Sequence, residues 1–452
     1  MQTDILTRTR SARPQRTVNQ IDRARAVVAA LFGPPEARSF TVRYWDESEE
    51  NPGVISDTPF TLWFKRPGAL RRMLLPPSEL AIAEAFINND IDLEGNAEYG
   101  MHLGDAIGQK VQSLSGIAGL LPLLRRLPHD DEQRRKRELE ALRFTGGLTR
   151  RRGGSAAIQH HYDVGNDFYK LWLDNRMVYS CAYFTSEKED LDSAQAGKLD
   201  LICRKLRLAP GHKLLDIGCG WGALIMHAAS NYGVDATGIT VSEAQAALAR
   251  ERIAQAGLES RCRVELVDYR DSRLSSRYDR ISSIGMMEHV GPSRLNGYFE
   301  WAYAALKPGG VFLNHTIVRD GRRKPETPRS KLEARLWRRD QFIHRYIFPD
   351  GRLIPVAHVA EVAERAGFEL RDVEAMREHY VMTLRHWLRR LEASENAASD
   401  LVGEKRFRTW RLYLLAAING FRRGSTSIVQ MILSKPDASG SSGMPLTRTY
   451  MV

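Results

Sequence analysis

Apolar runs of strand length recur through the middle of the chain and are separated by segments with helical patterning. The run Leu214–Ile217 leads into glycines 218, 220 and 222, and a helix is expected over 223–231. Further strand-like runs lie at 235–240, 263–267 and 278–285. This order of elements predicts an α/β fold with a doubly wound, Rossmann-like sheet.

Three glycines at alternate positions mark the end of the first predicted strand. Glycine there lets the backbone turn sharply and approach a ligand, while the N-terminus of the following helix points at that ligand. Open parallel sheets bind ligands at the carboxyl ends of their strands, where polar residues also collect in this chain. The Gly-x-Gly-x-Gly spacing, and Thr240 where a dinucleotide fold would offer an acid, argue against NAD. The site is more typical of an S-adenosylmethionine-dependent methyltransferase.

Six ordered motifs resemble those of the cyclopropane-fatty-acid synthases and their mycolic-acid and methyl-branched-lipid relatives. The motifs are His161–Tyr169, Tyr179–Phe184, the glycine turn, Met287–Gly291, Leu313–Ile317 and Tyr346–Gly351. The segment Glu84–Gly95 is similar to the amino-terminal domain of the same family. The resemblance implies a class I methyltransferase domain with a smaller N-terminal α+β lipid-binding domain. It also implies transfer of a methyl or methylene group from S-adenosylmethionine to the cis double bond of a phospholipid acyl chain, which forms a cyclopropane.

The resemblance further implies that bound bicarbonate deprotonates a carbocation formed in the acyl chain. The family holds this ion with groups that match Cys181, Glu288, His315, Tyr380 and the backbone of Ile317. Histidine and tyrosine can donate hydrogen bonds to an anion, and Glu288 can accept the bicarbonate hydroxyl or orient His315. Outside its motif, a cysteine such as Cys181 is more often a small core residue, and a lone tyrosine is more often packed than catalytic.

The cofactor residues implied by the resemblance follow the strand ends. Tyr179 and Ser180 are expected at the methionine part, with Gly218 and Gly220 lining it. Thr240, Ser242 and Gln245 are expected near the ribose, and Asp268 and Tyr269 near the adenine. Asp216 is expected to fix the glycine turn. Thr240 and Ser242 can also cap the helix that follows them.

The chain departs from the family pattern in two places. Members often carry a cysteine before a Phe-Arg pair late in the sequence, where this chain has Ala417. A covalent thiol mechanism through that site is therefore excluded. The segment Arg319–Asp340 is longer and more basic than the usual connection, which leaves the identity of the substrate open.

Length and composition agree with a two-domain enzyme. The chain has 452 residues, of which 43% are hydrophobic, so it can bury a large core. Its four cysteines, at positions 181, 203, 219 and 262, have neither metal-site spacing nor the pattern of a disulfide framework, so we expect no metal and a reducing cytoplasm. No apolar run approaches the roughly 20 residues that span a bilayer, and the amino terminus lacks the apolar core of a signal peptide.

The formal net charge of +11 calls for an anionic partner or serves solubility. Basic clusters at 134–137, 150–152 and 319–339 can meet nucleic acid or anionic lipid headgroups. A nucleic-acid methyltransferase would need a base-binding motif or an aromatic-interleaved basic groove, and neither is found. We therefore expect a peripheral enzyme at the inner face of the membrane, as the family implies, which also suggests a homodimer. A non-catalytic lipid-binding relative is disfavoured because the glycine turn, Gln245, Glu288 and His315 are intact.

Composition shifts divide the chain into five predicted parts. These are a disordered tail at 1–22, a lipid-binding domain at 23–145, a basic linker at 146–159, the methyltransferase domain at 160–435 and a disordered tail at 436–452. In the smaller domain, strands are expected at 40–45 and 60–64, joined by a loop that opens with an acidic run. Helices around 384–391 and 407–421 can roof an acyl-chain tunnel, although ordinary core packing explains the same pattern.

Overall fold

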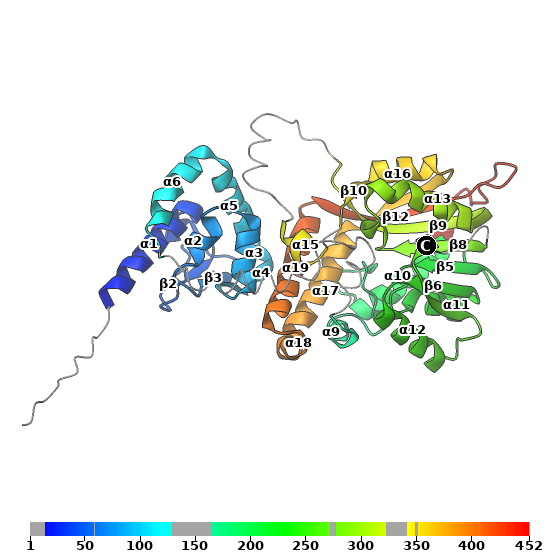
Figure 1. The fold of residues 1–452 in the computed structure, drawn as a ribbon, viewed down its shortest axis with the longest axis horizontal. Coiled ribbons are helices and arrows are strands. Elements are labelled where there is room, and N and C mark those ends of the chain that lie inside the picture. Colours follow the sequence, from blue (N-terminus) through cyan, green and yellow to red (C-terminus); the bar gives the residue numbers. More distant parts are fainter. Residues whose placement is uncertain are drawn as a thin grey trace, which may run out of the picture. The chain divides into compact units, whose positions relative to one another are not determined.

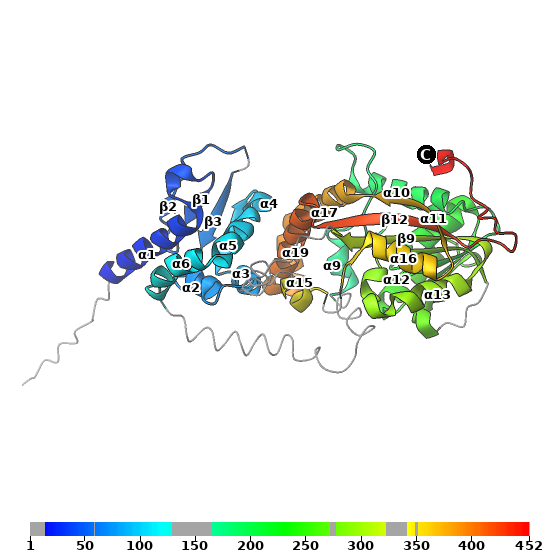
Figure 2. The same cartoon turned by 90° about the horizontal axis from the view of Figure 1, so that it is seen from above.

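The computed structural model describes residues 14–57, 59–128, 164–271, 277–321, 341–348 and 351–451 (Figures 1 and 2). The chain divides into two compact units, one made of residues 1–144 with 326–342 and the other of residues 145–325 with 343–452. The predicted linker at 146–159 and the start of the first family motif, at 161–163, lie outside the described residues, as do positions 322–340 of the basic segment.

The larger unit is built on an eight-stranded sheet in the order β11-β12-β9-β8-β5-β6-β7, with β10 beside β9. Strands β5 to β9 run parallel, and β12 runs antiparallel between β9 and β11. The bounds are β5 Lys213–Ile217, β6 Asp235–Thr240, β7 Cys262–Leu266, β8 Tyr278–Ile284, β9 Leu306–Arg319, β10 Ile354–Pro355, β11 Glu369–Ala375 and β12 Thr426–Ser434. The doubly wound α/β fold predicted from the sequence is confirmed, and its strand order reverses between β5 and β8.

Helices cover both faces of this sheet (Figure 1). On one face, α10 (Leu191–Lys205), α11 (Ala223–Tyr232) and α12 (Glu243–Gln255) bury residues such as Ile225 in one apolar cluster. On the other face, α13 (Leu295–Ala305) and α16 (Val356–Arg365) bury residues such as Phe299 in a second cluster. Burial of the sheet on both faces explains why four successive residues of β5, Leu214–Ile217, are buried and three of them are apolar.

Three further helices, α17 (Arg377–Ala393), α18 (Glu395–Val402) and α19 (Glu404–Arg422), pack together in the larger unit (Figure 1). The helices expected around 384–391 and 407–421 lie within α17 and α19. Their large side chains, including Trp387 and Leu414, are buried. Core packing therefore accounts for the apolar pattern of these helices.

The smaller unit is an α+β structure, as expected. Its sheet has the order β2-β1-β3-β4, in which β1 and β3 are parallel and the other pairs antiparallel. The strands are β1 Thr41–Arg43, β2 Glu49–Glu50, β3 Phe60–Phe64 and β4 Ile91–Gly95. The helices are α1 Pro14–Phe32, α2 Ala69–Leu74, α3 Glu79–Ile87, α4 Ala97–Gly100, α5 His102–Gln112 and α6 Leu114–Arg125.

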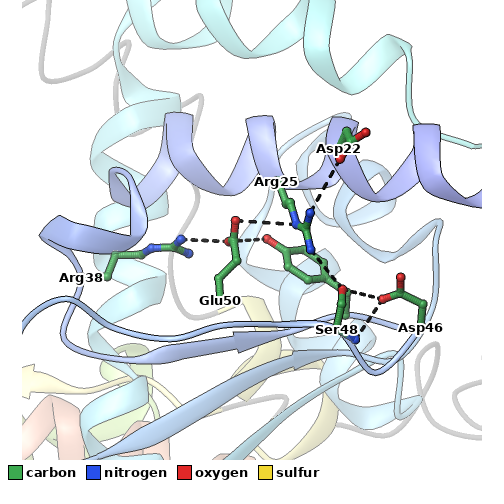
Figure 3. A network of polar contacts seen from close by, with 7 residues as sticks. Asp22, Arg25, Arg38, Asp46, Ser48 and Glu50 are labelled. Atoms are coloured by element: carbon green, nitrogen blue, oxygen red, sulfur yellow. Dashed lines mark hydrogen bonds and ion pairs between the residues drawn. The ribbon is translucent and has the colours of Figure 1, made fainter.

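The connection after β1 opens with the first residues of the acidic run, as expected, but Glu49–Glu50 within that run form the short strand β2. Figure 3 shows the reason: the Glu50 carboxylate lies among cationic and hydroxyl groups from distant positions. Its Oε2 accepts hydrogen bonds from Arg38 Nη2 at 2.9 Å and from the Tyr44 hydroxyl at 2.7 Å. Arg25 of helix α1 lies 3.8 Å from the other carboxylate oxygen, Oε1. These partners neutralise Glu50 and tie the strand to α1.

The structure describes parts of both predicted tails. Helix α1 begins at Pro14 and buries Ile21, so this helix begins inside the predicted tail 1–22. At the other end, Arg204 Nη1 donates to the Met451 carbonyl at 2.7 Å, and Arg448 pairs with the buried Asp372 at 2.6 Å. These contacts join the segment 436–451, which we expected to be a disordered tail, to α10 and β11. Within the described ranges, no helix is both long and apolar enough to cross a bilayer.

Candidate active site

The glycine turn lies at the carboxyl end of β5, beside the reversal of strand order. Gly218 and Gly220 have φ angles of +78° and +54°, which side chains other than glycine rarely adopt. The backbone N–H groups of Gly218 and Cys219 both donate to the Ile239 carbonyl, at 2.9 and 3.0 Å, which fixes the turn against β6. A Cβ added to Gly220 would meet no described atom within 4 Å. The turn thus presents bare backbone to an open space.

That space is a cavity lined by nine of the ten predicted cofactor residues. These are Tyr179, Ser180, Asp216, Gly218, Gly220, Thr240, Gln245, Asp268 and Tyr269. The tenth, Ser242, is not among the described lining residues, and its hydroxyl instead accepts a hydrogen bond from Gln245 N at 3.4 Å as the N-cap of α12. Residues from the ends of β5, β6 and β7 therefore converge on one site.

The Thr240 hydroxyl organises the part of the cavity near α12. It donates to Gln245 Oε1 at 3.0 Å and accepts from Ser242 N at 3.2 Å. We considered both helix capping and cofactor binding for Thr240 and Ser242, and the structure separates their contacts. Ser242 caps the helix, whereas Thr240 holds the Gln245 amide at the cavity wall.

The pKa values of two carboxyl groups in the cavity are shifted in opposite directions. Asp216 is buried and accepts a hydrogen bond from Ser282 Oγ at 2.7 Å, yet burial raises the pKa of Asp216 to about 6. Burial also opposes the ionisation of Asp268, but hydrogen bonds from Arg270 outweigh it and lower the pKa of Asp268 below its ordinary value. Asp268 is therefore an anion at neutral pH, and Arg270 is held beside it.

Lys198 also lines the cavity and was not predicted. Its side chain is 1% exposed, and its Nζ donates to Ser180 Oγ at 3.0 Å. Burial lowers the pKa of Lys198 to about 8, against the attraction of nearby carboxylates, chiefly Asp174. The sequence does contain a signal for the burial of this lysine. Lys198 and Lys205 lie seven residues apart on the face of α10 that also carries Leu191 and Ile202.

Three of the five predicted catalytic groups meet at β9. Ile317 N donates to Glu288 Oε1 at 2.6 Å, and Glu288 lies in the 3₁₀ turn Met287–His289 that follows β8. His315 lies two residues before Ile317 on the same strand, and its carbonyl accepts from Gly285 N at 2.9 Å. Burial raises the pKa of Glu288 to about 7, although the Ile317 hydrogen bond opposes this.

His315 is fully buried, and its Nδ1 lies 3.0 Å from Gln430 Nε2. Burial, together with the charges of Lys198 and Lys205, holds the pKa of His315 well below its ordinary value, so the imidazole is neutral. Among the described residues, neither His315 Nε2 nor Glu288 Oε2 has a hydrogen-bond partner. Buried polar atoms are nearly always paired, so these two suit a small ligand.

The remaining two predicted residues, Cys181 and Tyr380, both contact the backbone at the start of α17. Cys181 Sγ and the backbone N–H of Tyr380 both contact the Met376 carbonyl, at 3.8 and 3.1 Å. The Met376 N–H donates to Ile428, the residue of β12 that pairs with Ile317. Burial raises the pKa of Cys181 well above its ordinary value, so the thiol is neutral.

The five residues are thus linked through the backbone of Met376, Ile428 and Ile317. None of them is among the described lining residues of the glycine-turn cavity. They adjoin it through Tyr179 and Ser180, which line the cavity and directly precede Cys181. We refer to Cys181, Glu288, His315, Ile317 and Tyr380 as the inner cluster.

A family model described as mycolic acid cyclopropane synthetase matches residues 149–431. The chain belongs to this family. A second model, described as a domain of unknown function, matches residues 27–102 in the smaller unit. A probable fatty acid methyltransferase of Pseudomonas putida is 35% identical over 92% of this chain and 98% of its own length. The cyclopropane-fatty-acyl-phospholipid synthase of Escherichia coli K12 is 39% identical over 62% of this chain and 68% of its own length.

Solved structures of the same family agree with the fold. The cyclopropane synthase MmaA2 from Mycobacterium tuberculosis is 34% identical, with a TM-score of 0.57 over 62% of this chain and 97% of the other. The mycolic acid cyclopropane synthase CmaA1, complexed with SAH and CTAB, is 36% identical, with the same TM-score and coverage. This member of the cyclopropane synthase family is therefore an S-adenosylmethionine-dependent methyltransferase with a class I fold.

Proposed function

We propose that the enzyme adds a methylene group to the cis double bond of an unsaturated phospholipid acyl chain and so forms a cyclopropane. The observation that carries the proposal is the pairing of two sites, a glycine-turn cavity and an adjoining buried cluster in which His315 Nε2 and Glu288 Oε2 have no hydrogen-bond partner among the residues that the structure describes. A polar nucleophile such as an amine can release its proton to water after methylation. Alkylation of an alkene, in contrast, requires a base in a water-poor environment.

S-adenosylmethionine fits the cavity, because Gly220 leaves its wall open and Tyr179, Thr240 and Gln245 surround it. When bound, it supplies the electrophilic methyl group. Gln245 and Thr240 hold the ribose hydroxyls, and Tyr269 packs near the adenine. The ring of Tyr269 is itself fixed by edge contacts with Tyr298 and Trp301.

Bicarbonate fits the inner cluster, because the ion has oxygens that accept hydrogen bonds and a hydroxyl that donates one. When bound, it accepts the proton released by the alkylated chain. His315 Nε2, the Cys181 thiol and the Tyr380 hydroxyl donate to its oxygens, and Glu288 accepts from its hydroxyl. The low dielectric of a fully buried site strengthens each contact. The Ile317 N–H acts here through Glu288, to which it already donates.

The same proposal places the enzyme at an anionic membrane surface on the cytoplasmic side, as a homodimer with the smaller unit engaging lipid. The net charge of +11, which attracts acidic headgroups, supports the anionic surface. Flotation with anionic and with neutral liposomes at low and high salt tests the surface, with an oligonucleotide shift assay beside it. Binding to the oligonucleotide alone would overturn the lipid assignment. Light scattering of the purified chain tests the dimer.

Lipid analysis of a host that expresses the chain tests the reaction itself. We expect mass spectrometry to show acyl chains that gain one CH2, and proton NMR to show upfield ring signals as olefinic signals disappear. Cells expressing Gly220→Val serve as the control, because the inner cluster is unchanged in that variant. Unmodified lipids in cells that contain folded wild-type enzyme would reject the proposal.

A methyl- or methylene-branched product is the second candidate. The similarity to the probable fatty acid methyltransferase, which extends over 92% of this chain, favours it specifically. The cyclopropane forms when the transferred methyl group loses a proton as the ring closes. A methylene branch forms when a hydride first shifts within the cation and the methyl group then loses a proton, and a saturated methyl branch needs a hydride donor in addition. Methylene- or methyl-branch signals in place of ring signals in the NMR spectrum would select this candidate.

A further inference from the structure

A chain of buried hydrogen bonds approaches His315 from the side of Nδ1. Lys205 Nζ forms an ion pair with Glu374 and donates to Gln430 Oε1 at 2.7 Å. Gln430 Nε2 in turn lies 3.0 Å from His315 Nδ1. Lys205 is 1% exposed, and both Gln430 and His315 are fully buried. The pairing of β12 with β9 places Gln430 directly opposite His315, so the contact is built into the sheet.

The chemistry of these groups allows only one direction of donation. An ammonium group can only donate, so the side of the Gln430 amide that faces Lys205 must be its oxygen. The NH2 group of the amide then faces His315, and because it too can only donate, Nδ1 must be the acceptor. A neutral imidazole carries one proton, which must therefore lie on Nε2.

We propose that Lys205 and Gln430 are positioning residues that fix His315 in the tautomer with its proton on Nε2. The inference rests on the proposed function, because it states why His315 can donate to a bound oxyanion. In the other tautomer, Nε2 would present a lone pair to that anion. The ionic contact with Glu374 keeps the lysine ammonium aimed at the amide.

Nε2 would also be a donor if both ring nitrogens were protonated, but the surroundings of His315 disfavour that form. Burial and the positive charges of Lys198 and Lys205 disfavour the imidazolium form. A neutral ring with its proton held on one nitrogen therefore remains. Among the described residues Nε2 is unpaired, so its N–H is available to a ligand.

The tautomer is measurable without substrate or cofactor, by long-range proton–nitrogen NMR of the free enzyme with 15N-labelled histidine and assignment through His315→Gln. We expect a protonated Nε2 and an unprotonated Nδ1 in the wild type. In Gln430→Glu, a carboxylate that only accepts faces the ring, so Nδ1 should become protonated. In Glu374→Gln, the side-chain oxygen can still accept a hydrogen bond from Lys205, so the lysine remains directed at Gln430 and the wild-type pattern should persist.

A wild-type spectrum with the proton on Nδ1 overturns the inference, and so does an unchanged spectrum in Gln430→Glu. Both results are independent of turnover, so the failure of the proposed function would be recognised separately, as folded wild-type enzyme that leaves lipids unmodified.

Kinetics supply the second test. Lys205→Met frees the amide to rotate, and kcat should fall on the order of 10- to 100-fold, as when a partner that orients a histidine is removed. The affinity for S-adenosylmethionine should not change, and added bicarbonate should restore part of the rate. Lys205→Arg, which can still donate to the amide, should keep more activity than Lys205→Met. Equal losses in the two variants, or a loss confined to cofactor affinity, would assign Lys205 a purely structural role.

Discussion

Glu288 offers a quantitative test of the buried cluster. Its carboxyl group is buried and accepts a hydrogen bond from Ile317 N. Burial raises the pKa of Glu288 from 4.5 to about 7. Because one pKa unit corresponds to about 1.4 kcal/mol, holding the carboxylate ionised in the folded state costs about 3 kcal/mol. The stability associated with protonated Glu288 is complete below pH 4.5 and is lost as the pH rises through about 7.

Glu288→Gln removes this titration and keeps an oxygen that can accept from Ile317 N. Urea unfolding of both proteins at about pH 5 and about pH 8 measures the free energy of unfolding. The free energy of unfolding of the wild type should fall between these two pH values by about 2 to 3 kcal/mol more than that of the variant. A difference between the proteins that stays constant with pH would refute the reasoning, since it would mean that Glu288 titrates near 4.5 and is well solvated.

Three further outcomes are expected. Gly220→Val should abolish cofactor binding in calorimetry. Gly211 also has a positive φ and open surroundings but is not among the lining residues of the cavity, so Gly211→Val should keep cofactor binding and cost only about 1 to 2 kcal/mol of stability. Ser282→Ala should cost about 1 to 3 kcal/mol in urea unfolding, because it removes a hydrogen bond to the buried Asp216 carboxyl. His315→Ala should lose turnover in a methyl-transfer assay and retain cofactor affinity, and an equal loss of affinity would assign His315 to the cofactor cavity instead.

The parts of the fold that could be predicted are those with local causes. The strand ending at Ile217 and its glycine turn are legible because apolar runs and positive-φ glycines act within a few residues. The observed β6 and β3 coincide with the predicted runs 235–240 and 60–64. Strand β12, in contrast, finds its partners on β9 and β11, and no local pattern specifies that pairing.

The elements that escaped prediction depend on charges that are distant in sequence. Glu50 belongs to a strand because Arg38 and Tyr44 bind its carboxylate, and Arg448 joins the C-terminal segment to β11 through Asp372. The same holds within the site. The cavity side chains follow strand ends and could be predicted from motifs, whereas the contact between Lys205 and Gln430 joins positions 225 residues apart.

The antiparallel strand β12 gives His315 a cross-strand hydrogen-bond partner, Gln430. Side chains at the carboxyl ends of parallel strands surround an open cavity, which suits a cofactor that must enter and leave. His315 instead lies within β9, opposite Gln430 of β12, and is fully buried. Cross-strand neighbours share one face of the sheet, so Gln430 can hold the imidazole from a fixed direction. In the proposed reaction, the added strand thus orients a mid-strand histidine as a hydrogen-bond donor to bicarbonate.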